Sequence, residues 1–130
     1  MRILVADDND MVRRGVTGIL SSVTDWEVCG EAGDGSEALR KARELLPDLV
    51  LLDISMPGQS GLEAARLIRQ ELPKTKIIIM SQHDPIQLLP RVLEVGAHSC
   101  VDKSRLSTDL LASIRRVAAT QEAHRIANAG

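Results

Sequence analysis

Five polar residues stand at the ends of apolar stretches of the sequence, and their types suit the chemistry of metal ions and phosphate groups. Asp7 and Asp8 follow the run RILVA, Asp53 ends LVLLD, Ser81 follows KIIIM, and Lys103 follows HSCVD. Carboxylate oxygens are ligands that Mg²⁺ prefers in proteins. A lysine beside them would balance an anion that shares the site. These residue types predict a site for Mg²⁺ and a phosphate group, provided that the fold brings them together.

Two alternating patterns indicate the elements that must position these residues. Continuous apolar runs are typical of strands buried on both faces, whereas apolar residues at helical spacing are typical of helices that pack on a sheet. Strands are predicted at residues 2–6, 26–32, 49–53, 76–80 and 98–102. Helices are predicted around residues 12–23, 38–46, 61–72 and 85–95, and from residue 106 to about 120; in the second helix, Leu45 and Leu46 are expected to face inward.

The alternation of five strands with five helices predicts an α/β fold in which helices cover both faces of a parallel sheet. The common solution is a flavodoxin-like, doubly wound sheet with the strand order 2-1-3-4-5, whose ligand crevice lies at the carboxyl ends of strands 1 and 3. Asp7, Asp8 and Asp53 would then lie close together. Two carboxylates about 4 Å apart repel by roughly 4 kcal/mol near a protein surface, so three of them would destabilise the fold unless a cation balanced them.

The composition indicates one soluble domain. The chain has 130 residues, of which 44% are hydrophobic and 26% are charged, and a net charge of −2, which is unlike a membrane-bound or strongly nucleic-acid-coated protein. No stretch approaches the roughly 20 apolar residues of a membrane span. Cys29 and Cys100 stand singly and lack metal-ligand spacing, so two reduced, buried thiols in a cytoplasmic protein are predicted.

Taken in order, these features resemble the receiver domain of bacterial two-component response regulators. The resemblance rests on the acidic pair after the first strand, the pattern D-x-x-M-P-x-x-x-G from Asp53 to Gly61, Ser81 after the fourth strand and Lys103 after the fifth. It covers residues 1–120 and leaves residues 121–130 as a C-terminal extension or linker. The phrases GEAGDGSEAL and VLEVGA are similar in particular to receivers that precede a LuxR-type helix-turn-helix DNA-binding domain.

The resemblance implies that Asp53 accepts a phosphoryl group from a phosphohistidine of a sensor histidine kinase. Asp8, Asp53 and the backbone carbonyl of Ser55 would bind Mg²⁺, and Asp7 would orient metal-bound water. Together with the metal, Lys103 would neutralise charge on the transferred group. The domain would catalyse only its own phosphorylation and dephosphorylation.

The resemblance also implies how the signal is passed on. Ser81 would hydrogen-bond the phosphoryl group, and the fourth and fifth helices would shift toward an active arrangement. The expected output is transcription, through a DNA-binding domain that is absent from this chain. The expected partners are the kinase and, in a homodimer, a second copy of the chain, with DNA reached only through that output domain and no membrane involved.

The sequence departs from the usual receiver pattern at positions that bear on switching. Cys100 stands where receivers commonly carry Tyr or Phe, so the aromatic part of the switch is absent. Gln82 replaces a small residue and is expected to slow access to the nucleophile. His83 and Ser55 are candidates for tuning the lifetime of the phosphoryl group. Pro90 is expected to kink or shorten the fourth helix.

Other functions compatible with this fold fit the residues less well. A flavodoxin-type electron carrier would offer hydroxyls and amides to a phosphate in the first loop, where ADDND offers carboxylates. An aspartate-nucleophile phosphatase would usually have a second acid two residues after Asp53, where Ser55 stands. A degenerate or stand-alone receiver that acts as a protein-interaction module is the alternative that Cys100, Gln82 and Pro90 favour. Surface positions are expected for His98 and His124, and a solvated helix face rather than a DNA-binding patch for Arg115, Arg116 and Arg125.

Overall fold

The computed structural model of this chain describes the backbone of residues 1–129 and the side chains of residues 1–119. Its five strands form one parallel sheet in the order β2-β1-β3-β4-β5, which confirms the predicted flavodoxin-like, doubly wound fold. In chain order the elements are β1 (Arg2–Ala6), α1 (Asp10–Leu20), β2 (Glu27–Ala32), α2 (Gly35–Leu45), β3 (Leu49–Asp53), α3 (Gly61–Glu71), β4 (Lys76–Ser81), α4 (Pro85–Glu94), β5 (Ser99–Asp102), a 3-10 turn (Lys103–Arg105) and α5 (Leu106–Ala129).

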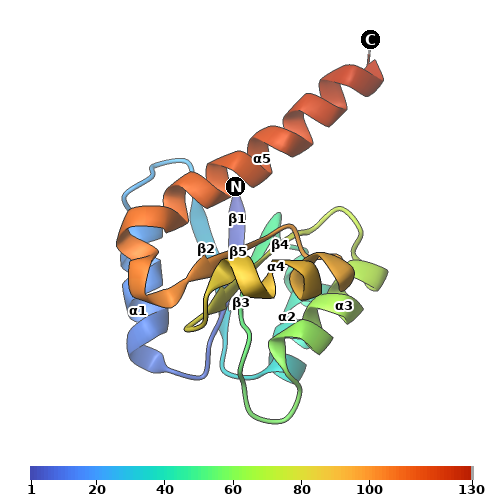
Figure 1. Cartoon of the computed structure of the whole chain (residues 1–130). Helices are drawn as coiled ribbons and strands as arrows, with labels where there is room; N and C mark the ends of the chain where they lie inside the picture. Colours follow the sequence, from blue (N-terminus) through green and yellow to red (C-terminus); the bar gives the residue numbers. More distant parts are fainter. Residues whose placement is uncertain (130) are drawn as a thin grey trace.

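The sheet is the middle one of three layers (Figure 1). α1 and α5 cover one face, and α2, α3 and α4 cover the other. Because successive side chains of a strand point to opposite faces, Ile77 and Ile79 pack toward α2, α3 and α4, whereas Ile78 and Met80 pack toward α1 and α5. All five residues of β3 are buried, which explains why its sequence has no polar position before Asp53.

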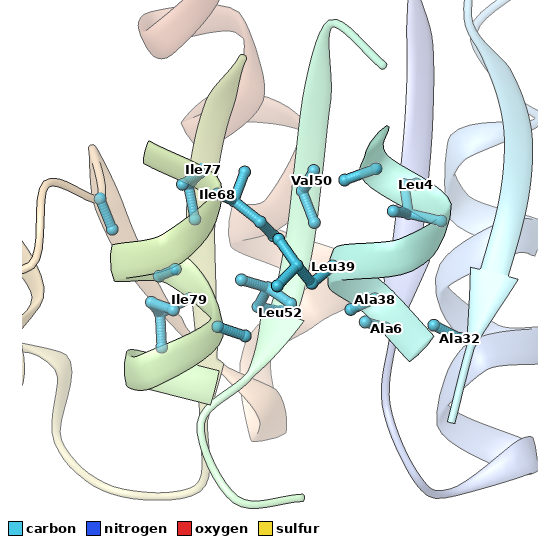
Figure 2. Packing of buried hydrophobic residues seen from close by; sticks show 14 of the residues in the cluster. Leu4, Ala6, Ala32, Ala38, Leu39, Val50, Leu52, Ile68, Ile77 and Ile79 are labelled. Carbon is cyan, nitrogen blue, oxygen red and sulfur yellow. The ribbon is translucent and has the colours of Figure 1, made fainter. Parts of the chain in front are cut away.

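The core consists of aliphatic side chains, in agreement with the near absence of aromatic residues from the sequence. Figure 2 shows Leu39 of α2 and Ile68 of α3 reaching toward strand residues such as Val50, Leu52 and Ile77. Each fully buried Leu or Ile side chain contributes roughly 1.5–3 kcal/mol relative to an exposed one. This core holds the strands in register, and the register sets which residues meet at the carboxyl edge of the sheet.

The ends of α1 and α2 differ from the predictions. α1 ends at Leu20, so Val23 lies beyond it. Leu46, expected to face inward, is 62% exposed and has a left-handed backbone with a φ of 49°. Pro47 follows, and a residue before proline avoids the right-handed helical conformation. The helix therefore ends at Leu45, and the side chain of Leu46 turns to solvent.

The last two helices compare differently with the predictions: α4 agrees with the predicted range of residues 85–95 to within one residue, whereas α5 is longer than predicted. α4 continues through Pro90, which is exposed, and the helix has ten residues against eleven in each of α1, α2 and α3. Since Pro90 has no N–H, the carbonyl of Ile86 lacks its intrahelical donor. α5 continues to Ala129, well past the predicted end near residue 120, and extends beyond the sheet (Figure 1). His124 and Arg125 lie outside the described side chains, and within the described residues no helix has the length and apolarity needed to cross a membrane.

Candidate phosphoryl and metal site

The carboxyl ends of β1 and β3 bring three carboxylates together, which is the convergence that the sequence predicts. Asp7 follows β1, Asp53 is the last residue of β3, and the two strands are neighbours in the sheet. One oxygen atom from each of Asp7, Asp8 and Asp53 lies within 4.8 Å of the other two. Asp7 and Asp53 are buried, whereas Asp8 is exposed. The cluster offers oxygen ligands both from a fixed interior and from the solvent side, a donor set that suits Mg²⁺.

Lys103 pairs with both buried carboxylates. Its Nζ lies 2.7 Å from Asp7 Oδ2 and 3.0 Å from Asp53 Oδ1, and its side chain is only 10% exposed. The contact with Asp7 is close but not aligned as a hydrogen bond, and is therefore an ion pair. Burial by itself lowers the pKa of Lys103, but the two carboxylates outweigh burial and leave that pKa raised. Lys103 thus lies between the two acids and partly neutralises them.

The Asp53 carboxyl group has a raised pKa. Burial is the largest cause and the negative charge of Asp7 adds to it, while Lys103 and the backbone N–H of Ser55, 3.3 Å from Oδ1, act in the opposite direction. Both of these stabilising contacts are made by Oδ1. Within the described residues no hydrogen bond to Oδ2 is found. The carboxylate therefore has one restrained oxygen and one that is available for bond formation.

Two glycines hold the loop between β3 and α3 close to Asp53. A Cβ atom on Gly61 would lie 2.0 Å from the backbone oxygen of Asp53, and one on Gly35 would lie 2.4 Å from the backbone oxygen of Gln59. The N–H of Gly61 also donates to the carbonyl of Ile54 over 3.0 Å. No side chain fits at either position without movement of the loop. Gly61 stands in the motif that begins at Asp53, whereas Gly35 becomes a site-supporting residue only through the tertiary contact.

A pocket of about 240 Å³ opens beside Asp53 and Lys103. Gln82 and His83 are exposed and lie on its wall. Ser81 is fully buried and is not part of that wall; its Oγ accepts a hydrogen bond of 2.9 Å from the backbone N–H of His83. The residues that line the pocket are Asp8, Asn9, Val12, Asp53, Ile54, Ser55, Gln82, His83 and Lys103.

Asn9 is a residue of this site that the sequence pattern does not single out. Its N–H donates to Asp7 Oδ1 over 2.9 Å. Its side-chain oxygen accepts hydrogen bonds from the N–H groups of Met11 and Val12, at the start of α1. Asn9 therefore links the orientation of the Asp7 carboxylate to the end of the helix. The run ADDND could have pointed to Asn9, because Asn is a preferred N-cap residue and Asn9 stands just before the first predicted helix.

Three residues outside the pocket differ from the expectations. Cys29 and Cys100 are free thiols but only partly buried, and burial together with the charge of Asp102 raises the pKa of the Cys100 thiol to about 11. The surface position expected for His98 is wrong. His98 is half-buried, because its Nδ1 accepts a hydrogen bond of 3.1 Å from the N–H of Ile77 and replaces a strand partner at the edge of the sheet.

The doubly wound sheet with an acidic cluster and a buried lysine at its carboxyl edge defines a class of signalling domain. Residues 3–115 match the family model of the response regulator receiver domain. The chain belongs to the response regulator receiver family of two-component systems.

Relatives and solved structures agree with this assignment. The chain is 39% identical over 121 residues to response regulator GacA of Pseudomonas viridiflava and 38% identical over 119 residues to the transcriptional activator protein ExaE of Pseudomonas putida. These alignments cover 93% and 92% of this chain but 56% of each relative, so the chain spans little more than half their length. The crystal structure of a LuxR-family two-component response regulator from Aurantimonas sp. SI85-9A1 matches with a TM-score of 0.86 and 34% identity, over 92% of this chain and 85% of that one.

Proposed function

We propose that this chain is a phosphorylatable receiver that accepts a phosphoryl group on Asp53 from a phosphohistidine of a sensor histidine kinase. The observation that carries the proposal is the state of the Asp53 carboxylate, which ends a buried strand, borders a pocket and contacts Lys103 and the N–H of Ser55 through Oδ1. Attack of Oδ2 on phosphorus forms the new O–P bond of an acyl phosphate. The P–N bond of the donor breaks, and its electron pair returns to the imidazole.

Mg²⁺ is the proposed cofactor. Asp8 and Asp53 would supply carboxylate oxygens, Ser55 its backbone carbonyl, and Asp7 would orient metal-bound water. The spacing of the three acids, within 4.8 Å, and the exposure of Asp8 support this donor set. A bound Mg²⁺ supplies positive charge next to the transferring phosphoryl group, and charge stabilisation accounts for most of the catalysis of this reaction.

Lys103 and Ser81 are proposed to respond to the new group. An acyl phosphate carries about −1.5 to −2 charges on its phosphoryl oxygens, so the ammonium of Lys103 is drawn from the former carboxylate toward them. The Ser81 hydroxyl accepts from the N–H of His83, which leaves its own proton free to be donated to a phosphoryl oxygen. Gln82 and His83, on the pocket wall, would control access of water and donors.

The proposed output is the control of transcription. ExaE is a transcriptional activator and the Aurantimonas neighbour is a LuxR-family regulator, which supports a DNA-binding output domain beyond the residues of this chain. Residues 1–120 would form the receiver unit in the cytoplasm, and residues 121–130 an extension that continues α5. Moving a two-state equilibrium from 1:99 to 99:1 takes about 5.5 kcal/mol, so a few new contacts are expected to give partial activation.

The test of phosphorylation is the intact mass of the protein after incubation with acetyl phosphate and Mg²⁺. We expect one phosphoryl adduct in the wild-type protein and none in Asp53→Asn or in the presence of EDTA. Asp48→Asn is the matched control, because it removes an exposed carboxylate that precedes the same strand and should leave the adduct in place.

A second phosphoryl donor is needed because Gln82 is expected to slow the access of acetyl phosphate to Asp53. If acetyl phosphate gives no adduct, the incubation is repeated with a phosphorylated histidine kinase. Absence of the adduct with both donors would contradict the proposal and favour the interaction-module alternative. An adduct of equal yield in Asp53→Asn would place the modification elsewhere.

A further inference from the structure

Lys103 has to reach across the sheet to make its two ion pairs. It follows β5, whereas Asp53 ends β3 and Asp7 follows β1, so one strand lies between it and Asp53 and two lie between it and Asp7. At about 4.8 Å between neighbouring strands, these offsets are roughly 10 Å and 14 Å. The five bonds from the Cα to the Nζ of a lysine span only about 6 Å. The backbone of Lys103 must therefore be held close to the position from which its ammonium meets both acids.

The chain around Lys103 is fixed on both sides by neighbouring elements. On the strand side, Asp102 forms the last pair between β4 and β5, with Ser81 as its partner. On the helix side, the 3-10 turn Lys103–Arg105 runs into α5 with no residue between them, and Leu110 of α5 is fully buried. The turn between these two anchors is three residues long, so its conformation decides where Lys103 lies.

The carboxylate of Asp102 closes this turn. Its Oδ1 atom accepts two hydrogen bonds from Ser104, one of 2.9 Å from the backbone N–H and one of 2.7 Å from Oγ. The first N–H groups of a helical turn have no acceptor within the turn, and a side-chain oxygen at the N-cap supplies one. The same hydrogen bonds lower the pKa of Asp102, so the acceptor is ionised at neutral pH. Asp102 and Ser104 thus hold Lys103 between them in a closed, hydrogen-bonded turn.

We propose that Asp102 is a positioning residue, which holds Lys103 at the place from which its ammonium reaches Asp53. The consequence for the reaction rests on the proposed function of Asp53. Among the described residues, Asp102 is not one that lines the pocket beside Asp53, so it acts through the lysine. Without the hydrogen bonds from Ser104, the turn opens and the ammonium of Lys103 spends less time between the two acids. The transferring phosphoryl group then loses part of the positive charge that stabilises its transition state.

Competitive acylation of the lysine amines tests the position of Lys103 in the whole chain without any phosphoryl donor. The 10% exposed Lys103 should react slowly with an N-hydroxysuccinimide ester and the exposed Lys74 rapidly, as measured by peptide mass spectrometry. We expect Asp102→Ala to raise the labelling rate of Lys103 by roughly five- to tenfold, the usual size of the effect of losing an N-cap. The partly buried Lys76 should keep its rate, which would exclude a general loosening of the fold.

Two further variants separate the closed turn from the charge of Asp102. Asp102→Asn is the rescue variant, because its amide oxygen accepts the same two hydrogen bonds without a charge. Asp109→Ala is the matched control, because it removes a nearby carboxylate that pairs with Arg105. Both variants should label Lys103 at about the wild-type rate. The proposal is overturned if Asp102→Ala leaves the labelling of Lys103 unchanged, if Asp102→Asn is labelled as fast as Asp102→Ala, or if Lys76 accelerates to the same extent.

The rate of adduct formation tests the consequence for the reaction. With acetyl phosphate and Mg²⁺, Asp102→Ala should form the phosphoryl adduct roughly five- to tenfold more slowly than the wild-type protein, and Asp102→Asn at about the wild-type rate. If the wild-type protein forms no adduct with acetyl phosphate or with a phosphorylated kinase, the proposed function fails, whereas the labelling rates still decide what holds Lys103. Faster labelling of Lys103 together with an unchanged adduct rate would overturn the role of Asp102 in the reaction.

Discussion

Lys103 lies closer to Asp7 than to Asp53, with its Nζ 2.7 Å from one carboxylate and 3.0 Å from the other. Asp7 is fully buried, receives the N–H of Asn9 and is not on the wall of the pocket, whereas Asp53 borders the pocket. The lysine is therefore anchored on the acid that is not proposed to react. Modification of Asp53 would remove one partner of Lys103 and leave the other in place.

We expect Asp53→Asn to raise the melting temperature by a few degrees. The pKa of Asp53 is raised in the folded protein, so ionisation of this group costs more there than in the unfolded chain. As the pH rises from below 3.8, the ordinary pKa of an aspartate, to the raised pKa of Asp53 in the folded protein, the wild-type protein should therefore lose stability relative to Asp53→Asn. Above the folded pKa the difference in stability between the two proteins should stay constant. Thermal melts at several pH values measure this; a difference that does not change with pH would contradict the assigned cause.

Lys103→Met should destabilise the fold by roughly 3 kcal/mol at neutral pH, because two buried carboxylates lose their cation. Since the pKa of Lys103 is raised, its contribution is fully present below 10.5 and is lost as the pH rises through the folded pKa. Urea unfolding near pH 8 and above pH 10.5 should show this loss in the wild-type protein but not in Lys103→Met. Lys74→Met, at an exposed lysine, is the control, and partial rescue by added Asp53→Asn is expected.

Two Gly→Ala substitutions should have opposite effects. A Cβ on Gly61 would meet the backbone of Asp53 at 2.0 Å, so Gly61→Ala should destabilise the protein by about 2 kcal/mol or more and displace the nucleophile. Gly15 is exposed within α1 and a Cβ there meets nothing within 4 Å, so Gly15→Ala should stabilise the protein by about 1 kcal/mol. Denaturant unfolding of both variants measures the change in the free energy of unfolding. If both variants were stabilised, the loop between β3 and α3 would have moved freely to accommodate the new side chain.

Cys100 should react slowly with alkylating reagents. A pKa of about 11 instead of 9.0 lowers the thiolate fraction at pH 8 from roughly 10% to roughly 0.1%, and only the thiolate reacts. Iodoacetamide labelling, followed by peptide mass spectrometry, should proceed about 100-fold more slowly in the native protein than in urea. Equal rates would mean that the thiol is not held in an apolar environment.

The strand order and the meeting of Asp7, Asp8 and Asp53 were predictable because both follow from periodicity and from the rule for parallel sheets. Continuous apolar runs allow only a sheet that is covered on both faces. The carboxyl ends of neighbouring strands then meet whatever the side chains are.

The errors arose where one tertiary contact or one backbone angle decides the outcome. Leu46 has the apolar character of a core residue, but Pro47 forces its backbone out of the helix. His98 looks like a surface residue until its Nδ1 is seen to accept the N–H of Ile77 from another strand. Gly35 becomes important only because Gln59, 24 residues later, packs against it. The distant partners Ile77 and Gln59 cannot be read from the sequence around His98 and Gly35, whereas Pro47 stands next to Leu46.

Pro90 affects the order in which the elements of the domain unfold. It removes a hydrogen bond from the middle of α4, and Val92 is the single residue of this helix that is buried, while Ile86, Leu89 and Leu93 are 81%, 39% and 53% exposed. An element with so few buried contacts opens at a lower free energy than the whole domain. The amide protons of α4 will therefore exchange with solvent through local unfolding, long before those of β3, whose exchange requires the sheet itself to separate.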